Sequence, residues 1–224
     1  MEKIIFAAKE VQGKKALFGR NRFSLKNIDF ALPAGYIMGI IGENGAGKTT
    51  FFHYIMDEKK RYQGKFYLDG VDIADDHAWA MNRIGFVSEE QCFLRQKSVM
   101  ENAKMLGSFY DVFDMDLFEE IMEQAKVPAA KNIENLSRGA YIKFQVAFAM
   151  AHKPKLFLLD EPTAGMDPVF RKEFYHLLRQ QLLEQGCSVI MSSHLEDDIH
   201  REFDYIGRLE HGEFVSFQEN REGE

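Results

Sequence analysis

A glycine-rich turn between two apolar runs constrains this chain more than any other feature. Residues 37–56 read IMGIIGENGAGKTTFFHYIM, and the pattern G-x-x-x-x-G-K-[ST] is formed by Gly42, Gly47, Lys48 and Thr49. The run before the turn has the pattern of a buried strand and the run after it that of a helix, which is the context this motif requires. Glycines let the backbone curl so that successive N–H groups point at phosphate oxygens. A glycine-rich turn without a ligand is the competing interpretation, and the strand–loop–helix order disfavours it.

The side chains that close the turn predict the same chemistry. Lys48 can reach the β- and γ-phosphates of a nucleotide, and the Thr49 hydroxyl can ligate Mg²⁺. The N-terminus of the following helix adds a dipole that favours anions. The stretch therefore predicts a nucleoside triphosphate site, but such loops serve kinases, GTPases and motors alike.

Composition excludes several classes of protein. The chain has 224 residues, of which 46% are hydrophobic and 28% charged, as in globular proteins with a sizeable core. Its longest apolar runs are far shorter than the ~20 residues that span a bilayer, and its first ten residues do not resemble a signal peptide. The net charge of −7 argues against a nucleic-acid partner, which would call for a basic face. Cys92 and Cys187 lie far apart without metal-ligand spacing, so we expect free thiols.

Hydrophobic periodicity divides the chain into three parts. The first third alternates apolar and polar residues, as in FSLKNIDFAL and KFYLDG, which predicts antiparallel strands. Residues 99–113 and 115–126 then show helical spacing, which predicts two amphipathic helices. The last third returns to strands, KLFLLD, CSVIMSS and YIGRLE, with a helix over residues 169–186. We expect an α/β core with a buried parallel sheet, an antiparallel part near the start and a helical insert.

Two carboxylates follow the apolar strand KLFLLD. Asp160 ends the strand, where a carboxylate is placed to bind Mg²⁺ directly or through water. Glu161 comes next, points elsewhere and can polarise an attacking water. An isolated pair of this kind would be read as a solvated strand end, but its position after the glycine-rich loop favours the catalytic interpretation.

The stretch NLSRGAYIKFQ, residues 135–145, allows two interpretations. Ser137 lies just ahead of a helix-like run, and serine is a favoured helix N-cap because its hydroxyl accepts an orphaned backbone N–H. Helix N-termini also hold phosphates in the same way, so the stretch is equally a candidate nucleotide contact.

Taken together, GENGAGKTT, LSRGA, LLDEPTAGMDP and SSH resemble, in order and spacing, the nucleotide-binding domain of ABC transporters. The resemblance covers essentially the whole chain. It implies one ABC ATPase domain over residues 1–224, an α/β P-loop NTPase fold with a mostly parallel core sheet, an N-terminal antiparallel β subdomain and an inserted α-helical subdomain at about residues 90–135. It also implies a Walker A motif at Gly42–Thr50, a Walker B motif at Leu156–Asp160 and a D-loop around Gly165–Asp167.

The resemblance assigns roles to individual residues. It implies that the catalytic residues are Glu161 as the base, Lys48 and the switch residue His194. Mg²⁺ would be held by Thr49, Asp160 and Glu89. ATP would be bound by Phe18, Gly42, Asn44, Gly45, Ala46, Gly47, Lys48, Thr49, Thr50, Ser137 and Gly139.

Three of these positions depart from the usual family pattern or admit an alternative. Phe18 matches the aromatic residue that stacks on adenine, with Phe23 as the fallback and a core phenylalanine as the bland interpretation. Glu89 stands where the family's Q-loop has glutamine, as in the branch that resembles drug, bacteriocin and antimicrobial-peptide exporters. In LSRGA, Arg138 and Ala140 replace a glycine and a glutamine of the usual L-S-G-G-Q, while Ser137 and the second glycine are retained.

The family pattern also implies partners and a mechanism. ATP would close a head-to-tail dimer, either of this chain with itself or with a paralogous ATPase, each site pairing one P-loop with the opposite signature loop. A separate transmembrane permease would dock near exposed apolar residues that include Phe93, Leu94, Met105, Phe109 and Tyr110. The competing interpretation, which is favoured for any single one of them, is that they pack the two amphipathic helices. The chain would then be a cytoplasmic ATPase, peripheral on the inner face of the membrane, that powers an exporter. A soluble non-transport ABC ATPase and an ATP-binding regulatory module with little turnover remain the alternatives.

Overall fold

The computed structural model describes residues 2–14, 24–88, 90, 92–163, 168–193 and 201–220. Its strands are β1 (Ile4–Gly13), β2 (Ile28–Pro33), β3 (Ile37–Ile41), β4 (Tyr62–Leu68), β5 (Val71–Asp72), β6 (Ile84–Val87), β7 (Leu156–Leu159), β8 (Ser188–Ser193), β9 (Tyr205–Glu210) and β10 (Glu213–Glu219). Its α-helices are α1 (Lys48–Ile55), α2 (His77–Met81), α3 (Val99–Gly107), α4 (Met115–Gln124), α5 (Arg138–Ala151) and α6 (Pro168–Gln185), and a short 3₁₀ helix, η1, spans Ile133–Asn135.

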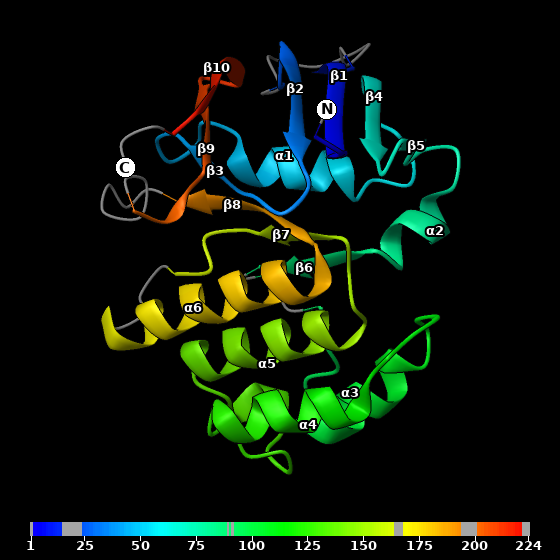
Figure 1. Ribbon diagram of the computed structural model, residues 1–224. Coiled ribbons are helices and arrows are strands. Elements are labelled where there is room, and N and C mark those ends of the chain that lie inside the picture. The colour runs from blue at the N-terminus through cyan, green and yellow to red at the C-terminus, as the bar shows by residue number, and fades with distance from the viewer. Residues whose placement is uncertain are drawn as a thin grey trace.

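The strands form two sheets with a helix between them. The smaller sheet has the order β2-β1-β4-β5 and is antiparallel in every pair. The larger has the order β10-β9-β3-β8-β7-β6, in which only the β10–β9 pair is antiparallel. Figure 1 shows α1 between the two sheets and the other long helices, α5 and α6, beyond the larger one. The mostly parallel core and the N-terminal antiparallel sheet confirm the expected fold class.

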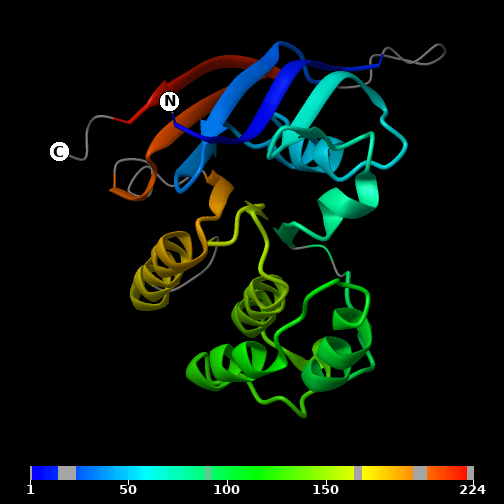
Figure 2. The same cartoon turned by 45° about the vertical axis from the view of Figure 1, so that its right-hand side comes forward.

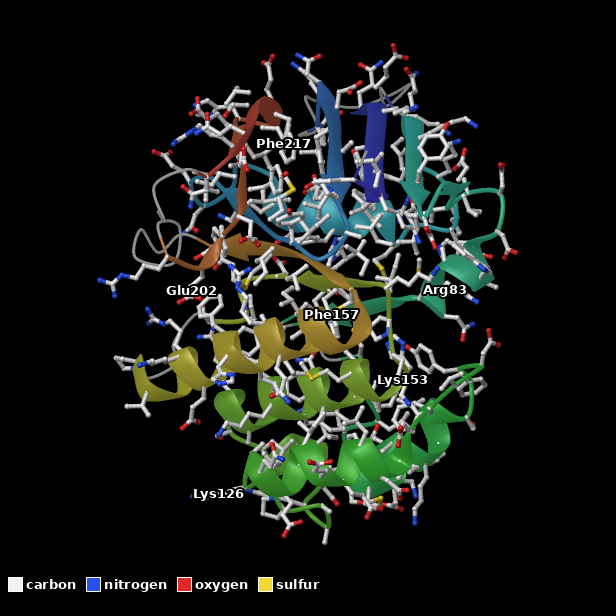
Figure 3. The ribbon with its side chains drawn as sticks, in the orientation of Figure 1. Arg83, Lys126, Lys153, Phe157, Glu202 and Phe217 are labelled. Atoms are coloured by element: carbon white, nitrogen blue, oxygen red, sulfur yellow. The ribbon has the colours of Figure 1, made fainter. Side chains whose placement is uncertain are left out.

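The core strands are buried on both faces, which explains why they read as continuous apolar runs. In β7, Leu156 and Leu158 join the core around α1, while Phe157 and Leu159 join the core around α5 and α6. Side chains alternate across a strand, so each strand contributes to both cores. Figure 3 shows Phe157 in the interior between the sheet and the helices.

The helices α3 and α4 lie between β6 and β7 in sequence, and they pack with α5 at the end of the molecule away from the antiparallel sheet (Figure 2). The expected helix over residues 99–113 is too long, because α3 ends at Gly107. The chain turns back there, and the Phe113 ring comes so close that a Cβ on Gly107 would lie 2.8 Å from it. No helix in the described part of the chain is long and apolar enough to cross a bilayer.

Candidate functional site

The glycine-rich loop joins β3 to α1 with its backbone N–H groups uncapped. Gly47 precedes α1 with φ 113°, and Gly45 has φ 84°, both in the left-handed region that favours glycine. Within the described residues no side chain caps α1, so its first N–H groups have the free donors that bind anions. Asn44 and Gly45 are exposed at the tip of the loop, whereas Ala46 is buried.

Gly42 is required by its surroundings rather than by its own φ. A Cβ at this position would lie 2.3 Å from the carbonyl oxygen of Leu209 in β9. The Ala46 carbonyl in turn accepts a hydrogen bond from Gly212 N at 2.9 Å, in the β9–β10 turn. The loop is therefore packed against neighbouring backbone at both ends.

Lys48 folds back into the loop. Its side chain is 5% exposed, and Nζ donates hydrogen bonds to the carbonyl oxygens of Gly42 at 2.7 Å and Glu43 at 3.3 Å. The same Nζ lies 3.2 Å from Glu161 Oε1. A buried ammonium needs such partners, because an unpaired charge in the interior is strongly disfavoured. The ion pair brings the two predicted catalytic groups of separate motifs into contact.

Asp160 accepts hydrogen bonds from two hydroxyl groups. Thr49 Oγ1 donates to Asp160 Oδ2 at 2.6 Å, and Ser192 Oγ donates to Asp160 Oδ1 at 2.7 Å. Hydroxyl and carboxylate oxygens are the ligands that Mg²⁺ prefers, and Mg²⁺ is commonly held by one or two such groups together with phosphate oxygens. Thr49 and Asp160 thus fit the metal that the sequence motifs imply.

Glu161 leaves the line of the strand by an unusual backbone turn. Its φ is 47°, in the left-handed region where a non-glycine residue is uncommon and costs about 1–3 kcal/mol. Its N–H donates to Ser192 Oγ at 2.7 Å, so one serine holds the backbone of Glu161 and the carboxylate of Asp160. Sequence reasoning missed Ser192. The signal was present, because two polar residues end the apolar strand β8 beside β7.

Ser137 confirms one of its two interpretations directly. It is the N-cap of α5, and its Oγ accepts a hydrogen bond from Ala140 N at 3.3 Å. Ser137 and Arg138 are exposed, and a Cβ on Gly139 would meet no atom within 4 Å. The helices α1 and α5 pack on opposite faces of the larger sheet. The structure therefore brings Lys48, Thr49, Asp160 and Glu161 together but leaves the Ser137 stretch facing outward. Phe18, Phe23, Glu89, His194 and the expected D-loop lie outside the described residues.

A second hollow lies between the core and the helices α3 and α5. The cavity has a volume of about 460 Å³ and a mostly apolar lining: Met56, Met81, Asn82, Ile84, Phe86, Cys92, Phe93, Leu106, Phe109, Tyr110, Gln145, Phe148, Ala149 and His152. Three of the five apolar residues expected at a docking face, Phe93, Phe109 and Tyr110, line it. Leu94 and Met105 do not, although both are exposed.

His152 and Gln145 are the buried polar side chains among the residues that line this cavity. The His152 ring stacks on Tyr110 with centroids 4.2 Å apart, and its Nδ1 has no hydrogen-bond partner among the described residues. Burial lowers the pKa of His152 to about 4, so the ring is neutral at pH 7.

Comparison with known proteins gives a consistent result. The family model described as "ABC transporter" matches residues 25–164. The chain is 31% identical over 186 residues to the ABC transporter ATP-binding protein YtrB of Bacillus subtilis (strain 168), an alignment that covers 83% of this chain and 63% of that protein. It is 30% identical over 213 residues to the linearmycin resistance ATP-binding protein LnrL of the same organism, covering 93% and 66%. It is 26% identical over 194 residues to the bacitracin transport ATP-binding protein BcrA of Bacillus licheniformis, covering 86% and 63%.

The chain thus spans less than two thirds of the length of these curated relatives. Among solved structures, the dimeric ATP-binding cassette MJ0796 bound to ADP and Pi is similar with a TM-score of 0.83 at 23% identity, covering 97% of this chain and 99% of that chain. At this identity the likeness establishes the fold.

Proposed function

We propose that this chain, which belongs to the ABC transporter family, binds ATP with Mg²⁺ in the loop Gly42–Thr50 and hydrolyses it. The observation that carries the proposal is the joining of two motifs more than a hundred residues apart. Thr49 Oγ1 contacts Asp160 Oδ2 at 2.6 Å, and Lys48 Nζ contacts Glu161 Oε1 at 3.2 Å. A cation ligand set and a lysine–carboxylate pair therefore meet at the start of one helix.

Each residue then has a definite task. The N–H groups of the loop and of the first turn of α1 bind phosphate oxygens, and Lys48 donates to the β- and γ-phosphates. Mg²⁺, held by Thr49 and Asp160, would neutralise charge on the phosphates. Glu161 accepts the proton of the attacking water, and Ser192 keeps its backbone in the strained turn that aims it there.

The residues outside the described part complete the proposal. Phe18 would stack on adenine, His194 would contact the γ-phosphate, and Glu89 would hold Mg²⁺ or its water. We also propose that residues 1–224 form a single ABC ATPase domain. The inserted helical subdomain would span about residues 90–135.

We further propose that the site is completed by a second ATPase subunit, either another copy of this chain or a paralogue. Ser137 is exposed, Gly139 is partly exposed, and a Cβ on Gly139 would meet no atom within 4 Å. The N-terminus of α5 therefore has room for the phosphates bound by an opposite P-loop. Closure around ATP would exclude water and align Glu161, and hydrolysis would separate the subunits.

The Glu161→Gln variant tests both parts of this proposal. Glutamine keeps the shape of the side chain but cannot act as a base, so we expect turnover to fall about 10²–10⁴-fold while ATP binding persists. Phosphate release and size-exclusion chromatography with Mg²⁺ATP measure the two effects. We expect the variant, unlike the wild type, to accumulate as a dimer. A wild type without ATPase activity, alone or with its permease, would contradict the enzyme assignment and favour a regulatory module.

The cavity beside α3 is the proposed docking site of a separate membrane permease. Its apolar lining and the exposed Phe109, 79% accessible, suit the apolar face of a helix from a partner. The neutral ring of His152 offers one buried polar contact, which would favour a partner with a matching hydrogen-bonding group. Figure 3 shows Arg83 and Lys153 on this side of the molecule. The names of the bacitracin and linearmycin relatives support an exporter of drugs or peptides at the cytoplasmic face of the membrane.

Replacement of Phe109 tests the docking site. Phe109→Asp should abolish co-purification of a multispan membrane protein and leave the ATPase activity of the isolated chain within about twofold, because the Phe109 side chain is 79% exposed. Val169→Asp, at a residue 70% exposed on α6, is the matched control. Capture of ribosomes or DNA in place of a membrane protein would instead favour the non-transport alternative.

A further inference from the structure

Gln145 is a buried amide on a helix face that is otherwise apolar. It is 2% exposed, and its neighbours on α5 include Phe144, Val146 and Phe148. An unpaired amide in such a place is strongly disfavoured, so its hydrogen-bond partners are the reason it is tolerated.

Both ends of the amide bind one residue. Ser88 N donates to Gln145 Oε1 at 3.2 Å, and Gln145 Nε2 donates to the Ser88 carbonyl oxygen at 2.8 Å. Ser88 directly follows β6, the edge strand of the larger sheet. Two opposed bonds to one residue reproduce what a hydrogen-bonded neighbour in an antiparallel strand would supply. Gln145 therefore takes the place of a further strand at this point of the edge.

The neighbouring segment is held from the same helix and from α1. Tyr141, one turn before Gln145, donates its hydroxyl hydrogen to the Glu90 carbonyl at 3.1 Å. Residues four apart lie on one face of a helix, so Tyr141 and Gln145 form a single clamp. The Glu90 carboxylate in turn lies 3.2 Å from His53 Nε2. His53 is one turn after Thr49 on α1.

The clamp also acts on the strand beside the catalytic carboxylates. The residue before Ser88 is Val87, and its carbonyl accepts a hydrogen bond from Asp160 N at 2.8 Å. A shift at Ser88 would therefore move the end of β6 against the backbone of Asp160. A series of contacts therefore connects α5, which carries Ser137, to Asp160 through Ser88. A second series connects α5 to α1 through Glu90.

We propose that Gln145 is a positioning residue: with Tyr141 it holds Ser88 and Glu90, so that the outward-facing end of α5 keeps a fixed position relative to the Thr49–Asp160 pair. The inference rests on the proposed ATPase function. Its consequence is that loss of the clamp slows turnover after ATP has bound, because Gln145 touches neither the loop nor Lys48.

Two substitutions of Gln145 test it. Gln145→Leu removes both bonds to Ser88, whereas Gln145→Glu keeps the shape and makes the clamp depend on pH. A protonated glutamic acid can donate to the Ser88 carbonyl and accept from its N–H, but a carboxylate can only accept. Burial raises the pKa of a carboxyl group, so acidification towards pH 6 should restore the second bond. Gln124→Leu, the same change at an exposed residue of α4, is the control.

We expect Gln145→Leu to lower kcat about tenfold with the KM for ATP within twofold, since small misplacements of reacting groups have effects of this order. The kcat of Gln145→Glu relative to wild type should be several-fold higher at pH 6 than at pH 8, and the ratio for Gln145→Leu should be flat. Thermal unfolding at each pH corrects for the folded fraction. The positioning role alone is overturned if the wild type is active but unfolding fully explains the kcat loss of Gln145→Leu. It is likewise overturned if the kcat ratio of Gln145→Glu to wild type does not depend on pH. An inactive wild type overturns the proposed function itself.

Discussion

The loop at the start of α1 and the stretch at the start of α5 are two helix N-termini that differ in what surrounds them. At α1, Lys48 is 5% exposed and bonded to the Gly42 carbonyl and to Glu161. At α5, Ser137 is exposed, its Oγ accepts a hydrogen bond from the N–H of Ala140, and it lies two residues before a glycine with open space around it.

The difference supports the proposal that one chain builds one half of a site and presents the other half outward. Buried polar groups must be paired within the chain, so the P-loop half is assembled before a nucleotide arrives. An exposed helix N-terminus needs no internal partner and is free to meet a ligand held elsewhere. Changes in the first half should therefore impair the isolated chain, and changes in the second should impair only its association.

The largest effect is expected at Lys48. Lys48→Ala removes the ammonium that we propose donates to the phosphates, and it removes the ion pair with Glu161, so turnover should fall at least about 10²–10³-fold. ATP binding by the monomer, measured with a fluorescent analogue, should weaken as well. Lys59→Ala, at an exposed lysine just beyond α1, should bind and hydrolyse ATP as the wild type does. If the Lys48→Ala monomer bound ATP as tightly as the wild type, the proposed difference between the N-termini of α1 and α5 would be wrong.

Ser137→Arg should give the next largest effect, and only in association. An arginine at this exposed position would meet the opposite subunit, so ATP-dependent dimerisation of the Glu161→Gln protein should weaken at least about tenfold, or 1.4 kcal/mol. Nucleotide binding by the monomer should stay within about twofold.

The control is Ser98→Arg, which removes the N-cap of another helix, α3. Both changes delete a cap worth about 1 kcal/mol and should lower thermal stability alike. Equal dimerisation in the two variants would remove the Ser137 stretch from the site.

The two halves also differ in how far sequence could predict them. The P-loop is contiguous, and Asp160 could be placed because parallel strands end at one edge of a sheet, so these residues were found together. Ser192 and Gln145 were not found, because their partners come from separate elements that only the fold brings near. Periodicity predicted two helices in the insert but extended α3 past Gly107, since it does not register a ring folding back. That Ser137 contacts a nucleotide held by an opposite subunit is implied by resemblance alone and stays a prediction.

Substitutions of Gly42 and Gly139 compare the two helix N-termini at one glycine each. Gly42→Ala would place a Cβ 2.3 Å from the Leu209 carbonyl oxygen, and we expect a loss of about 1–3 kcal/mol in the free energy of unfolding. Gly139→Ala meets nothing within 4 Å, and alanine favours a helix, so stability should be unchanged or rise by up to about 1 kcal/mol. Urea unfolding measures both. Dimerisation with ATP should weaken in Gly139→Ala in spite of its normal stability; a normal dimer there would show that the open space has no function.

The smallest effect that we expect is a change in the pH dependence of stability, at the C-terminal end of α5. His152 ends α5 at the opposite end from Ser137, and burial lowers its pKa to about 4 from an ordinary value of 6.5. Between these values the unfolded chain binds a proton that the folded chain does not, so stability is full above pH 6.5 and falls as the pH is lowered towards 4. The contribution has a limiting slope of about 1.4 kcal/mol per pH unit. His152→Phe keeps the stack on Tyr110 and removes the titration, so its unfolding free energy should fall less steeply with acid than that of the wild type. His176→Phe, at an exposed histidine of α6, should keep the wild-type slope. The wild type and His152→Phe could show the same dependence of unfolding free energy on pH. In that case His152 is less buried in solution than in the structure, and this end of α5 is not rigidly packed.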